Sequence, residues 1–391
     1  MRKAGAVPLR VAVDATPLLV ARSGVGRYIE GMLSGLAELD AAPQPLLTLF
    51  SWRGSLSEAV PPGSRSAPRR FPARLLLPMW AHLGFPPVEL LTGRIDVFHA
   101  GNFVLPPLRR AVGVVTIHDL TYLRYPQTVD ATVASYRHHV PSALARAARV
   151  ITVSDAVRAE LVAEYSLDPS SVVVAPNGVD AGWFDAQPAT VADRARLGLP
   201  ERYLLFVGNR EPRKGLATLA RAHAAARRES ADVPQLVLVG PAGWGDVWGG
   251  TPPDPHDVLQ LGYLPEGDLR RVVAGALALC LPSRYEGFGL PVLEALACGR
   301  PVVASDLAAH REVGGDQVRY VEAADMDAWA QALLDLSVPP ADADAQVEVD
   351  EERARRARAA EFTWRRSAIV HLKTWRAAAG MSDSEALRYE R

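Results

Sequence analysis

The sequence predicts an α/β protein made of two doubly wound domains, each a parallel sheet covered by helices on both faces. Short runs rich in Val and Ile alternate with longer helical patterns, and this alternation starts again at Tyr203 after a polar stretch containing Ala and Pro. The length of 391 residues also suits two domains of similar size better than a single core.

We expect the first domain to span residues 1–187 and the second 188–391, with the last helix a candidate to pack back on the first domain. The strands expected in the first domain are Leu9–Val13, Pro45–Phe50, Val97–His99, Val112–Ile117, Val150–Val153 and Val172–Ala175, with helices at Gly26–Leu39 and Thr132–Ala148. Those expected in the second are Tyr203–Val207, Leu236–Val239, Leu277–Leu281, Pro301–Ala304 and Arg319–Val321. Two stretches, Ser55–Arg74 and Pro241–His256, are expected to be long irregular loops. The acidic, Ala-rich stretch Ser337–Glu351 is expected to be a solvated link before the final helices.

The composition narrows the class of protein. Hydrophobic residues make up 49% and charged residues 22%, and the formal net charge is −1, which argues against a general nucleic-acid binder. Cys280 and Cys298 are expected to be buried thiols. Arg10, Asp14 and Pro17 interrupt the first apolar run, and no run approaches the length of a membrane span. The sequence therefore predicts a cytoplasmic protein, with a peripheral position at the inner face of a membrane as an alternative.

The segment from Pro282 to Asp306 is the most informative. After a buried strand comes the loop Glu286-Gly287-Phe288-Gly289-Leu290, and a helix is expected from about Pro291. The glycines let the backbone approach a ligand, and the helix start offers free N–H groups to a diphosphate. Glu286 and Glu294 are carboxylates that can accept hydrogen bonds from sugar or ribose hydroxyls.

A second strand-to-helix turn lies between Phe206 and Leu216. It carries Arg210, Arg213 and Lys214, which can offset the charge of a departing nucleoside diphosphate. The spacing of a Walker loop is absent. We therefore expect this turn to join the Glu286 segment in one donor site at the carboxyl ends of the strands.

These motifs resemble those of the retaining glycosyltransferases of family 4. The pair Glu286 and Glu294 is similar to the family's E-x7-E signature, and EPRKGL is similar to its diphosphate-binding motif. Further matching pieces are SGVGRY (Ser23–Tyr28), TIHDL (Thr116–Leu120), ITVSDAVRAEL (Ile151–Leu161), PNGVD (Pro176–Asp180), LGYLPEGDL (Leu261–Leu269) and the FTW segment near Phe362. The resemblance implies a GT-B fold, two Rossmann-like domains facing a central cleft, and points to the mannosyl- and rhamnosyltransferase-like branch.

The resemblance also implies roles for single residues. Glu286 would contact the sugar hydroxyls and Glu294 the ribose, while Lys214 with Arg213 or Arg210 would bind the diphosphate. The remaining residues expected at the donor are Gly26, which approaches the phosphate, Tyr263 and Leu264 beside the base, Gly287, Phe288, Gly289 and Leu290 in the loop, and His118 beside the transferring sugar. His99, Asn102 and Asp119 are either structural or part of the site, and the sequence does not decide between the two.

The function implied is transfer of a hexosyl group, with mannose from GDP-mannose favoured over other nucleotide sugars, onto a hydroxyl of a glycan, a lipid-linked acceptor or a small molecule. Retention by front-face attack, without a metal or other cofactor, ranks above a covalent intermediate on Glu286. The alternatives are a phosphorylase or epimerase of similar fold, and a catalytically silent sugar-nucleotide-binding or scaffold protein.

The segment Arg65–Gly84 has two interpretations. It combines four arginines with an apolar run that contains Trp80. Such a segment is typical either of an ordinary buried helix beside a basic loop or of a surface that rests on an anionic membrane.

Overall fold

The chain divides into two compact units that are each discontinuous in sequence. The computed structural model describes residues 9–19, 23–40, 42–54, 56, 60, 64–337 and 345–381. Unit 1 comprises Met1–Leu123, Thr132–Gly178 and Thr363–Arg391, and unit 2 comprises Arg124–Ala131 and Val179–Phe362. The ranges expected from the sequence, 1–187 and 188–391, are continuous, with only the last helix named as a candidate to pack on the first domain. They do not contain the short excursion at 124–131.

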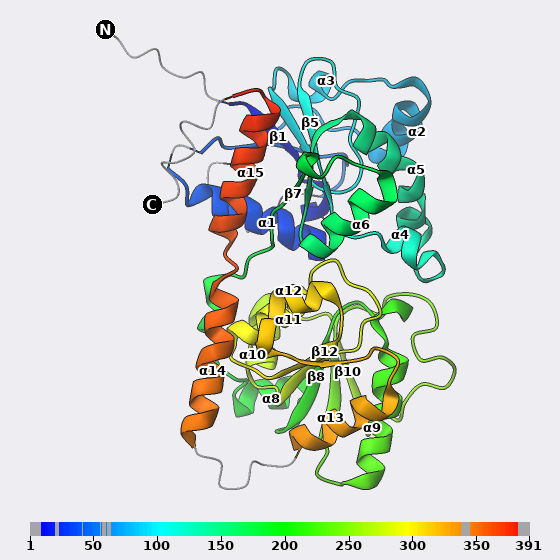
Figure 1. Ribbon diagram of the computed structural model, residues 1–391, viewed down its shortest axis with the longest axis vertical. Helices are drawn as coiled ribbons and strands as arrows, with labels where there is room; N and C mark the ends of the chain where they lie inside the picture. The colour runs from blue at the N-terminus through cyan, green and yellow to red at the C-terminus, as the bar shows by residue number, and fades with distance from the viewer. Residues whose placement is uncertain are drawn as a thin grey trace. The chain divides into compact units, whose positions relative to one another are not determined.

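The described part of unit 1 contains a seven-stranded sheet in which all neighbouring strands are parallel (Figure 1). Its order is β3-β2-β1-β4-β5-β6-β7, so the strand order reverses between β1 and β4. The strands are β1 (Val11–Asp14), β2 (Leu46–Thr48), β3 (Arg65–Ser66), β4 (Val97–Ala100), β5 (Val112–Ile117), β6 (Ala147–Thr152) and β7 (Val172–Val174). Such a reversal opens a crevice at the carboxyl ends of the two central strands.

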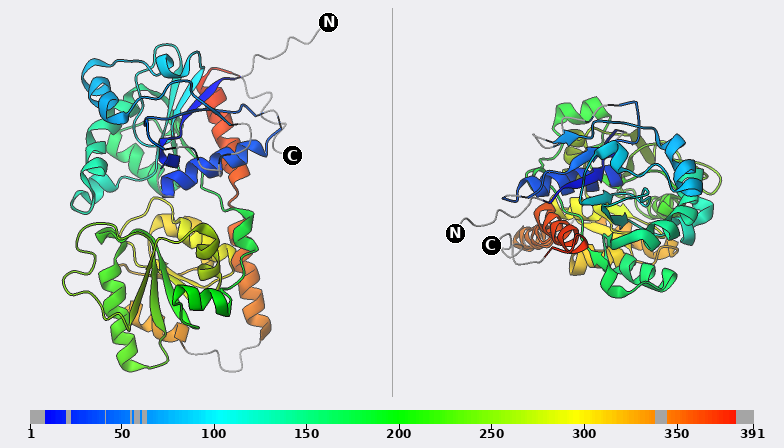
Figure 2. Two further views of the ribbon diagram at one scale, coloured as in Figure 1. Left: turned by 180° about the vertical axis from the view of Figure 1, so that it is seen from behind. Right: turned by 90° about the horizontal axis from the view of Figure 1, so that it is seen from above.

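The helices of unit 1 are α1 (Gly24–Ala37), α2 (Ala73–Leu83), α3 (Glu89–Thr92), α4 (Thr121–Arg124), α5 (Ala131–Arg146), α6 (Asp155–Tyr165) and α15 (Trp364–Ala378), with α4 and α5 crossing the limits of the unit. α1 begins where the hydroxyl of Ser23 accepts a hydrogen bond from the N–H of Gly26 at 3.1 Å. α15 packs closely on α1, because a Cβ on Gly31 would lie 2.0 Å from the ring of Trp364. Figure 2 shows the same two helices side by side from behind.

The described part of unit 2 contains a six-stranded parallel sheet of order β10-β9-β8-β11-β12-β13. The strands are β8 (Tyr203–Val207), β9 (Gln235–Val239), β10 (Val258–Gly262), β11 (Ala278–Leu281), β12 (Val302–Ser305) and β13 (Arg319–Val321). Here the order reverses between β8 and β11. The two motifs singled out in the sequence directly follow these two strands.

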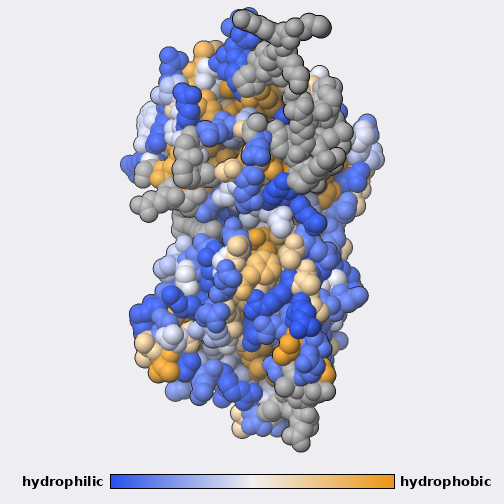
Figure 3. All heavy atoms as spheres, turned by 90° about the vertical axis from the view of Figure 1, so that its left-hand side faces the viewer, coloured by the Kyte–Doolittle hydropathy of each residue, from blue (hydrophilic) through white to orange (hydrophobic). Residues whose placement is uncertain are grey.

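The helices of unit 2 are α7 (Ala181–Phe184), α8 (Val191–Leu197), α9 (Leu216–Glu229), α10 (Glu266–Ala274), α11 (Leu290–Ala297), α12 (Ala308–Gly314), α13 (Met326–Ser337) and α14 (Ala345–Ala360). Arginines of α14 bind the carboxyl ends of two of them. Arg356 donates to the carbonyl of Ala297 at 3.0 Å, and Arg358 donates to that of Val313 at 3.0 Å. Hydrophilic residues dominate the side of unit 2 on which α14 lies (Figure 3).

The prediction of two parallel, doubly wound sheets is confirmed, and so are the two free, buried cysteines. Three local predictions were wrong. The strand β10 was missed, because its partly exposed pattern gives no continuous apolar run. Ser55–Arg74, expected to be irregular, contains β3 and the first residues of α2. Within Ser337–Glu351, residues 338–344 lie outside the described residues, and the remainder belongs to α13 and α14. Among the helices that the structure describes, none is long and apolar enough to cross a membrane.

Candidate active site

The two sequence motifs of unit 2 meet at the reversal between β8 and β11. The N–H of Arg284 donates to the carbonyl of Arg213 at 2.8 Å. Gly215 has a positive φ of 70°, and a Cβ there would lie 2.0 Å from the carbonyl oxygen of Pro282. Only glycine allows the backbones to approach so closely. The loop after β8 and the loop after β11 therefore form one surface.

An ion-paired cluster joins these loops. The Lys214 Nζ atom lies 2.5 Å from one carboxylate oxygen of Glu286, and Arg213 Nη1 lies 3.3 Å from the other. Between 11% and 13% of each of these side chains is exposed. Burial opposes the ionisation of Glu286, but the charges of Lys214 and Arg213 outweigh it and hold the pKa of Glu286 well below its ordinary range. The carboxylate is therefore an acceptor of hydrogen bonds at neutral pH.

Ser283 is a fully buried member of this cluster that the sequence interpretation missed. Its hydroxyl donates to Glu286 at 2.7 Å, on the same oxygen that binds Lys214. A serine three residues before the glutamate in the same loop is the signal that could have found it. The loop is also fixed by a hydrogen bond of 2.9 Å from Arg213 to the carbonyl of Tyr285.

A second missed residue, His310, lies against the start of α11. Gly289 has a φ of 109°, and a Cβ there would lie 3.0 Å from the ring of His310. His310 Nδ1 lies 2.8 Å from the carbonyl of Ser305, which can only accept, so Nδ1 carries the proton. The buried Nε2 atom of His310 is then a hydrogen-bond acceptor with no partner among the described residues. Burial lowers the pKa of His310, which favours the neutral ring.

The remaining residues of the predicted donor loop differ in their burial and in the residues that they contact. Leu290 begins α11, one residue before the expected start, and Glu294 lies in the same helix with 2% of its surface exposed. Phe288 is buried, with its ring 6.0 Å from that of Phe362, so it packs within unit 2. Gly287 lies between Glu286 and Phe288 in the chain.

The structure separates Arg210 from the ion-paired cluster. The Arg210 guanidinium contacts the side-chain oxygen of Gln260 and lies 3.4 Å from the carbonyl of Pro241. Arg213 is thus the arginine that joins Lys214. Tyr263, half exposed, and Leu264 follow β10, at the edge of the sheet where Gln260 lies.

A short segment from the middle of the chain is part of unit 2 and was not foreseen. The hydroxyl of Tyr125 donates to the carbonyl of Arg284 at 3.3 Å, and its ring lies 5.8 Å from that of Tyr285. The indole N–H of Trp244 donates to the carbonyl of Thr128 at 2.7 Å. Both contacts fix loops at the carboxyl end of the unit 2 sheet.

In unit 1, His118 follows β5 and Gly26 lies in the first turn of α1. His118 Nε2 lies 2.8 Å from the carbonyl of Gly101, so this nitrogen carries the proton of the neutral ring. Burial lowers the pKa of His118, although Gly101 and Asp119 act in the opposite direction. The edge of its ring packs on Tyr28, with ring centroids 4.8 Å apart.

A directed chain of hydrogen bonds lies beneath His118. His371 Nδ1 must donate to the carbonyl of Ser367 at 2.7 Å, and therefore His371 Nε2 accepts from the Tyr28 hydroxyl at 2.7 Å. Tyr28 in turn accepts from Thr116 at 2.7 Å, and Thr116 accepts from His99 Nε2 at 2.8 Å. Burial lowers the pKa of His371 to about 4, so the chain consists of neutral groups. His99 is thus structural, one of the two roles left open by the sequence.

Asp14, at the end of β1, is another group that the sequence interpretation missed. Its carboxylate accepts a hydrogen bond from the N–H of Thr16 at 2.9 Å. Burial raises the pKa of Asp14 to about 6, in spite of the bonds from Thr16. The carboxyl group at the strand reversal of unit 1 therefore keeps its proton to a higher pH than an exposed aspartate does.

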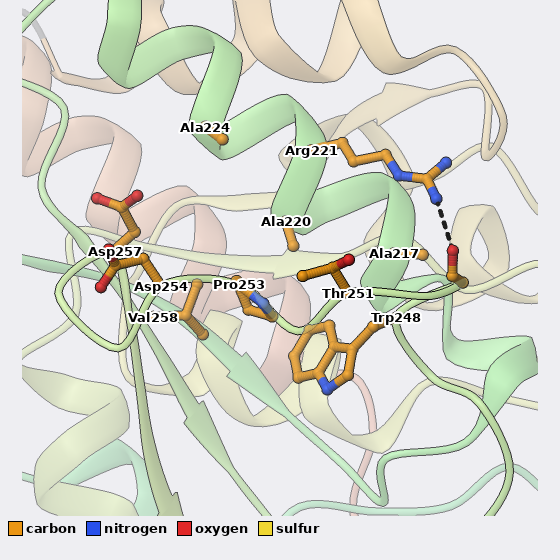
Figure 4. A pocket seen from close by; sticks show the side chains of 11 residues that line it. Ala217, Ala220, Arg221, Ala224, Trp248, Thr251, Pro253, Asp254, Asp257 and Val258 are labelled. Atoms are coloured by element: carbon orange, nitrogen blue, oxygen red, sulfur yellow. Dashed lines mark hydrogen bonds between the residues drawn. The ribbon is translucent and has the colours of Figure 1, made fainter.

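Two further features bear on the site. Among the described residues no cluster of three or more His, Cys, Asp or Glu is suited to hold a metal ion. A cavity of about 350 Å³ lies along α9, where Ala217, Ala220, Ala224 and Trp248 form part of its wall (Figure 4). None of the residues predicted for the donor site lines it.

Comparisons with known proteins show the family to which this chain belongs. A family model described as Glycosyltransferase Family 4 matches residues 22–183, and one described as Glycosyl transferases group 1 matches residues 201–337. The alpha-maltose-1-phosphate synthase of Mycobacterium tuberculosis is 32% identical over 283 residues, which cover 64% of this chain and 69% of that protein. The chain belongs to glycosyltransferase family 4. The resemblance inferred from the sequence motifs is thereby confirmed.

One further relative and one solved structure are also similar to this glycosyltransferase. The O-antigen chain mannosyltransferase B of Escherichia coli is 32% identical over 247 residues, 61% of this chain. The match spans 64% of that protein's length, slightly less than two thirds. The structure of a sucrose-phosphate synthase from Thermosynechococcus elongatus has a TM-score of 0.69 at 21% identity, covering 96% of this chain and all of that one. This likeness supports the GT-B fold of two Rossmann-like domains.

Proposed function

We propose that this protein is a retaining hexosyltransferase that moves mannose from GDP-mannose to a hydroxyl acceptor. The observation that carries the proposal is the cluster of Lys214, Arg213 and Glu286 at the strand reversal of unit 2. The two cations are paired with two carboxylates, Glu286 and Glu211, the latter 2.9 Å from Arg213. Cations and a carboxylate at the carboxyl ends of parallel strands suit a ligand with a diphosphate and a polyol. The named activity of the Escherichia coli relative favours mannose as the sugar.

In the unliganded site the charges neutralise one another, and binding of the donor exchanges their partners. The diphosphate takes the place of Glu286 beside Lys214 and Arg213, because its charge exceeds that of one carboxylate. Glu286 then accepts hydrogen bonds from the sugar hydroxyls, and Glu294 accepts from the ribose. The start of α11 at Leu290 contributes backbone N–H groups to the diphosphate.

The reaction forms a bond between the acceptor oxygen and the anomeric carbon, and the bond from that carbon to the phosphate oxygen breaks. The acceptor proton passes to the departing phosphate oxygen on the same face, so the configuration is retained. Lys214 and Arg213 stabilise the charge on the departing diphosphate, and we propose no metal or other cofactor for this task. His118 and Gly26 contact the transferring sugar and the phosphate, while Tyr263 and Leu264 contact the base.

The acceptor is a glycan, a lipid-linked acceptor or a small molecule, in the synthesis of a polysaccharide, glycolipid or glycosylated metabolite. We propose that the reaction takes place in the cytoplasm, where nucleotide sugars serve as donors. The neutral ring of His118 supports a hydroxyl rather than a charged acceptor group.

Two substitutions test the cluster. We expect Lys214→Ala to lower kcat/KM for transfer by a factor of about 10³, because one buried cation opposite the leaving group is removed. Glu286→Gln should leave GDP binding nearly intact but lower kcat/KM by about 10². Lys373→Ala and Glu348→Gln, which change the same residue types in α15 and α14, are the matched controls. Full transfer activity in both site variants would refute the site.

The nucleotide is tested by thermal unfolding with GDP-, UDP-, TDP- and ADP-sugars, since a ligand that binds only the folded state raises Tm. Selective stabilisation by GDP-mannose is expected. Selective stabilisation by another donor would refute GDP-mannose while leaving the transferase proposal in place. A sugar nucleotide that stabilises the protein, but is neither transferred to any acceptor supplied nor slowly hydrolysed, would favour the alternative. The protein would then be a catalytically silent sugar-nucleotide-binding protein.

A further inference from the structure

Three segments of unit 1 meet beside α2 and α3, which lie at its outer edge (Figures 1 and 2). The indole N–H of Trp52 donates to the carbonyl of Arg70 at 3.1 Å, and the guanidinium of Arg69 donates to the carbonyl of Leu90 at 2.8 Å. The N–H of Val88 donates to the carbonyl of Pro107 at 2.9 Å. Residues 52–54, 65–94 and 107–110 therefore form one surface, which we name the α2–α3 face.

Large apolar side chains are exposed on this face. The exposed fractions are 71% for Leu83, 57% for Trp52, 52% for Phe85, 48% for Leu90 and 44% for Leu75. Within the part of unit 1 that the structure describes, every exposed large hydrophobic side chain lies on this face. Scattered apolar residues are ordinary on a protein surface, but a group confined to one face marks a surface that binds a partner.

The same face is basic. Residues 42–110 contain eight arginines and three acidic residues, Glu58, Glu89 and Asp96, and Glu58 lies outside the described residues. Asp96 is paired with Arg10 at 2.6 Å. The carboxylate of Glu89 accepts hydrogen bonds from the N–H groups of residues 109 and 110, both at 2.8 Å. The described acidic groups are thus already engaged, while the arginines keep their positive charge.

The face is held in place by the core beneath it. The N–H of Ala73 donates to the carbonyl of Phe50 at 2.9 Å, and the rings of Phe50 and Trp80 meet edge to face at 5.2 Å. The indole N–H of Trp80 donates to the carbonyl of Pro86 at 3.0 Å. α2 therefore presents its exposed side chains from a fixed position, and binding requires no ordering of this helix.

We propose that the α2–α3 face docks on an anionic lipid bilayer. Leu83, Phe85 and Trp52 enter the boundary between headgroups and acyl chains, and the surrounding arginines bind lipid phosphates. A nucleic acid would use the arginines but would leave the aliphatic Leu83 and Leu75 in water. A bilayer is the partner that satisfies both kinds of side chain at once. Docking requires no step of the transfer reaction, so it stands or falls independently of the donor site.

Vesicle co-sedimentation of the full chain tests the proposal. We expect binding to vesicles of phosphatidylcholine mixed with an equal amount of phosphatidylglycerol, and much weaker binding to phosphatidylcholine alone. The double variant Leu75→Asp/Leu83→Asp should lower the affinity at least about tenfold. The double variant Arg74→Glu/Arg94→Glu should lower the affinity for these vesicles at least about 25-fold, because each arginine contributes a factor of about five. Added salt should also weaken the binding of the wild-type protein to the vesicles. Arg69 and Arg70 are left unchanged because they donate hydrogen bonds to backbone carbonyls.

The control variants lie in unit 2. Val191→Asp changes a side chain that is 74% exposed, and Arg353→Glu reverses an exposed charge of α14. Both should bind vesicles as the wild type does, and unfolding temperatures should show that all variants are folded. Absence of binding to the anionic vesicles, equal binding to neutral ones, or equal loss in the controls would overturn the proposal. The proposal would also be overturned if the protein bound single-stranded DNA tightly and the Leu75→Asp/Leu83→Asp variant still bound the vesicles.

Discussion

The strand order reverses between β1 and β4 in unit 1 and between β8 and β11 in unit 2. The side chains at the two reversals differ in charge. At the reversal of unit 2, Lys214, Arg213 and Glu286 form ion pairs in a nearly buried cluster. At the reversal of unit 1, the polar groups are neutral histidines and hydroxyls, and the carboxyl group of Asp14 has a raised pKa. The same topology therefore holds paired charges in unit 2 and neutral hydrogen-bonding groups in unit 1.

The charge of the polar groups differs between the two units because burial and neighbouring charges differ. Burial disfavours a charge unless an opposite charge lies nearby, and unit 2 provides such charges on both of its central loops. In unit 1 the charge of Asp119 does not outweigh burial at His118, so the buried histidines stay neutral and the chain of hydrogen bonds has a single direction. Four substitutions sharpen or break this comparison.

Gly215→Ala should have the largest effect. The added Cβ meets the carbonyl of Pro282 at 2.0 Å, and alanine disfavours the φ of 70°. We expect a loss of about 4 kcal/mol in the free energy of unfolding, measured by denaturant titration. Gly198→Ala has a similar φ and no atom within 4 Å, so it isolates the cost of the backbone conformation. Gly26→Ala in unit 1, where the nearest atom is 3.4 Å away, should cost far less; a loss equal to that of Gly215→Ala would break the comparison.

Asp14→Asn should change how stability depends on pH. The pKa of Asp14 in the folded state, about 6, lies above the ordinary value of 3.8 for an aspartate, so between these values the folded state keeps a proton that the unfolded state has lost. Asp14 therefore contributes stability that is fully present below pH 3.8 and is lost as the pH rises through 6. We expect the variant to lack this loss, up to about 3 kcal/mol between the two limits.

Thermal unfolding of wild type and Asp14→Asn across this pH range measures the effect. Asp232→Asn, an exposed position of unit 2, serves as the control. Parallel curves for wild type and Asp14→Asn would show that the carboxyl group of Asp14 titrates normally.

Tyr28→Phe should cost about 2 kcal/mol, because it leaves the buried His371 Nε2 and the Thr116 hydroxyl without their common partner. The phenyl ring still packs on His118, so kcat for transfer should change little. Tyr165→Phe removes a partly buried hydroxyl that pairs with Tyr122 and should cost less. A larger loss for Tyr165→Phe would contradict the assigned chain.

Ser283→Ala should have the smallest effect, about 1 kcal/mol, because Glu286 keeps its two cationic partners. Donor affinity, followed by calorimetry, should fall several-fold because Glu286 is held less firmly. Ser170→Ala removes an exposed serine–aspartate hydrogen bond of 2.7 Å and is the matched control. Unchanged donor affinity in Ser283→Ala would remove this serine from the site.

The sequence was sufficient for features that depend on local patterns. The parallel sheets follow from apolar runs such as Tyr203–Val207, and the meeting of Lys214 with Glu286 follows from two strand-to-helix loops at one edge of a sheet. The roles assigned to these residues stay predictions. His310 and the Tyr125 segment were beyond reach, because their positions are set by contacts between residues far apart in the chain. The raised pKa of Asp14 was beyond reach because it depends on the burial of the carboxyl group in the folded unit. The choice of Arg213 over Arg210 also depended on a contact, that of Arg210 with Gln260.

The position of α15 in unit 1 has a consequence for folding during synthesis. Trp364 fills the space left by Gly31 on α1, and His371 completes the hydrogen-bond chain from Tyr28. These residues leave the ribosome only after all of unit 2 has been made. Until then α1 has an uncovered apolar side, and Tyr28 lacks its acceptor. Unit 2 can thus reach its native state before unit 1 does, so the first half of the chain to be synthesised is the last to be completed.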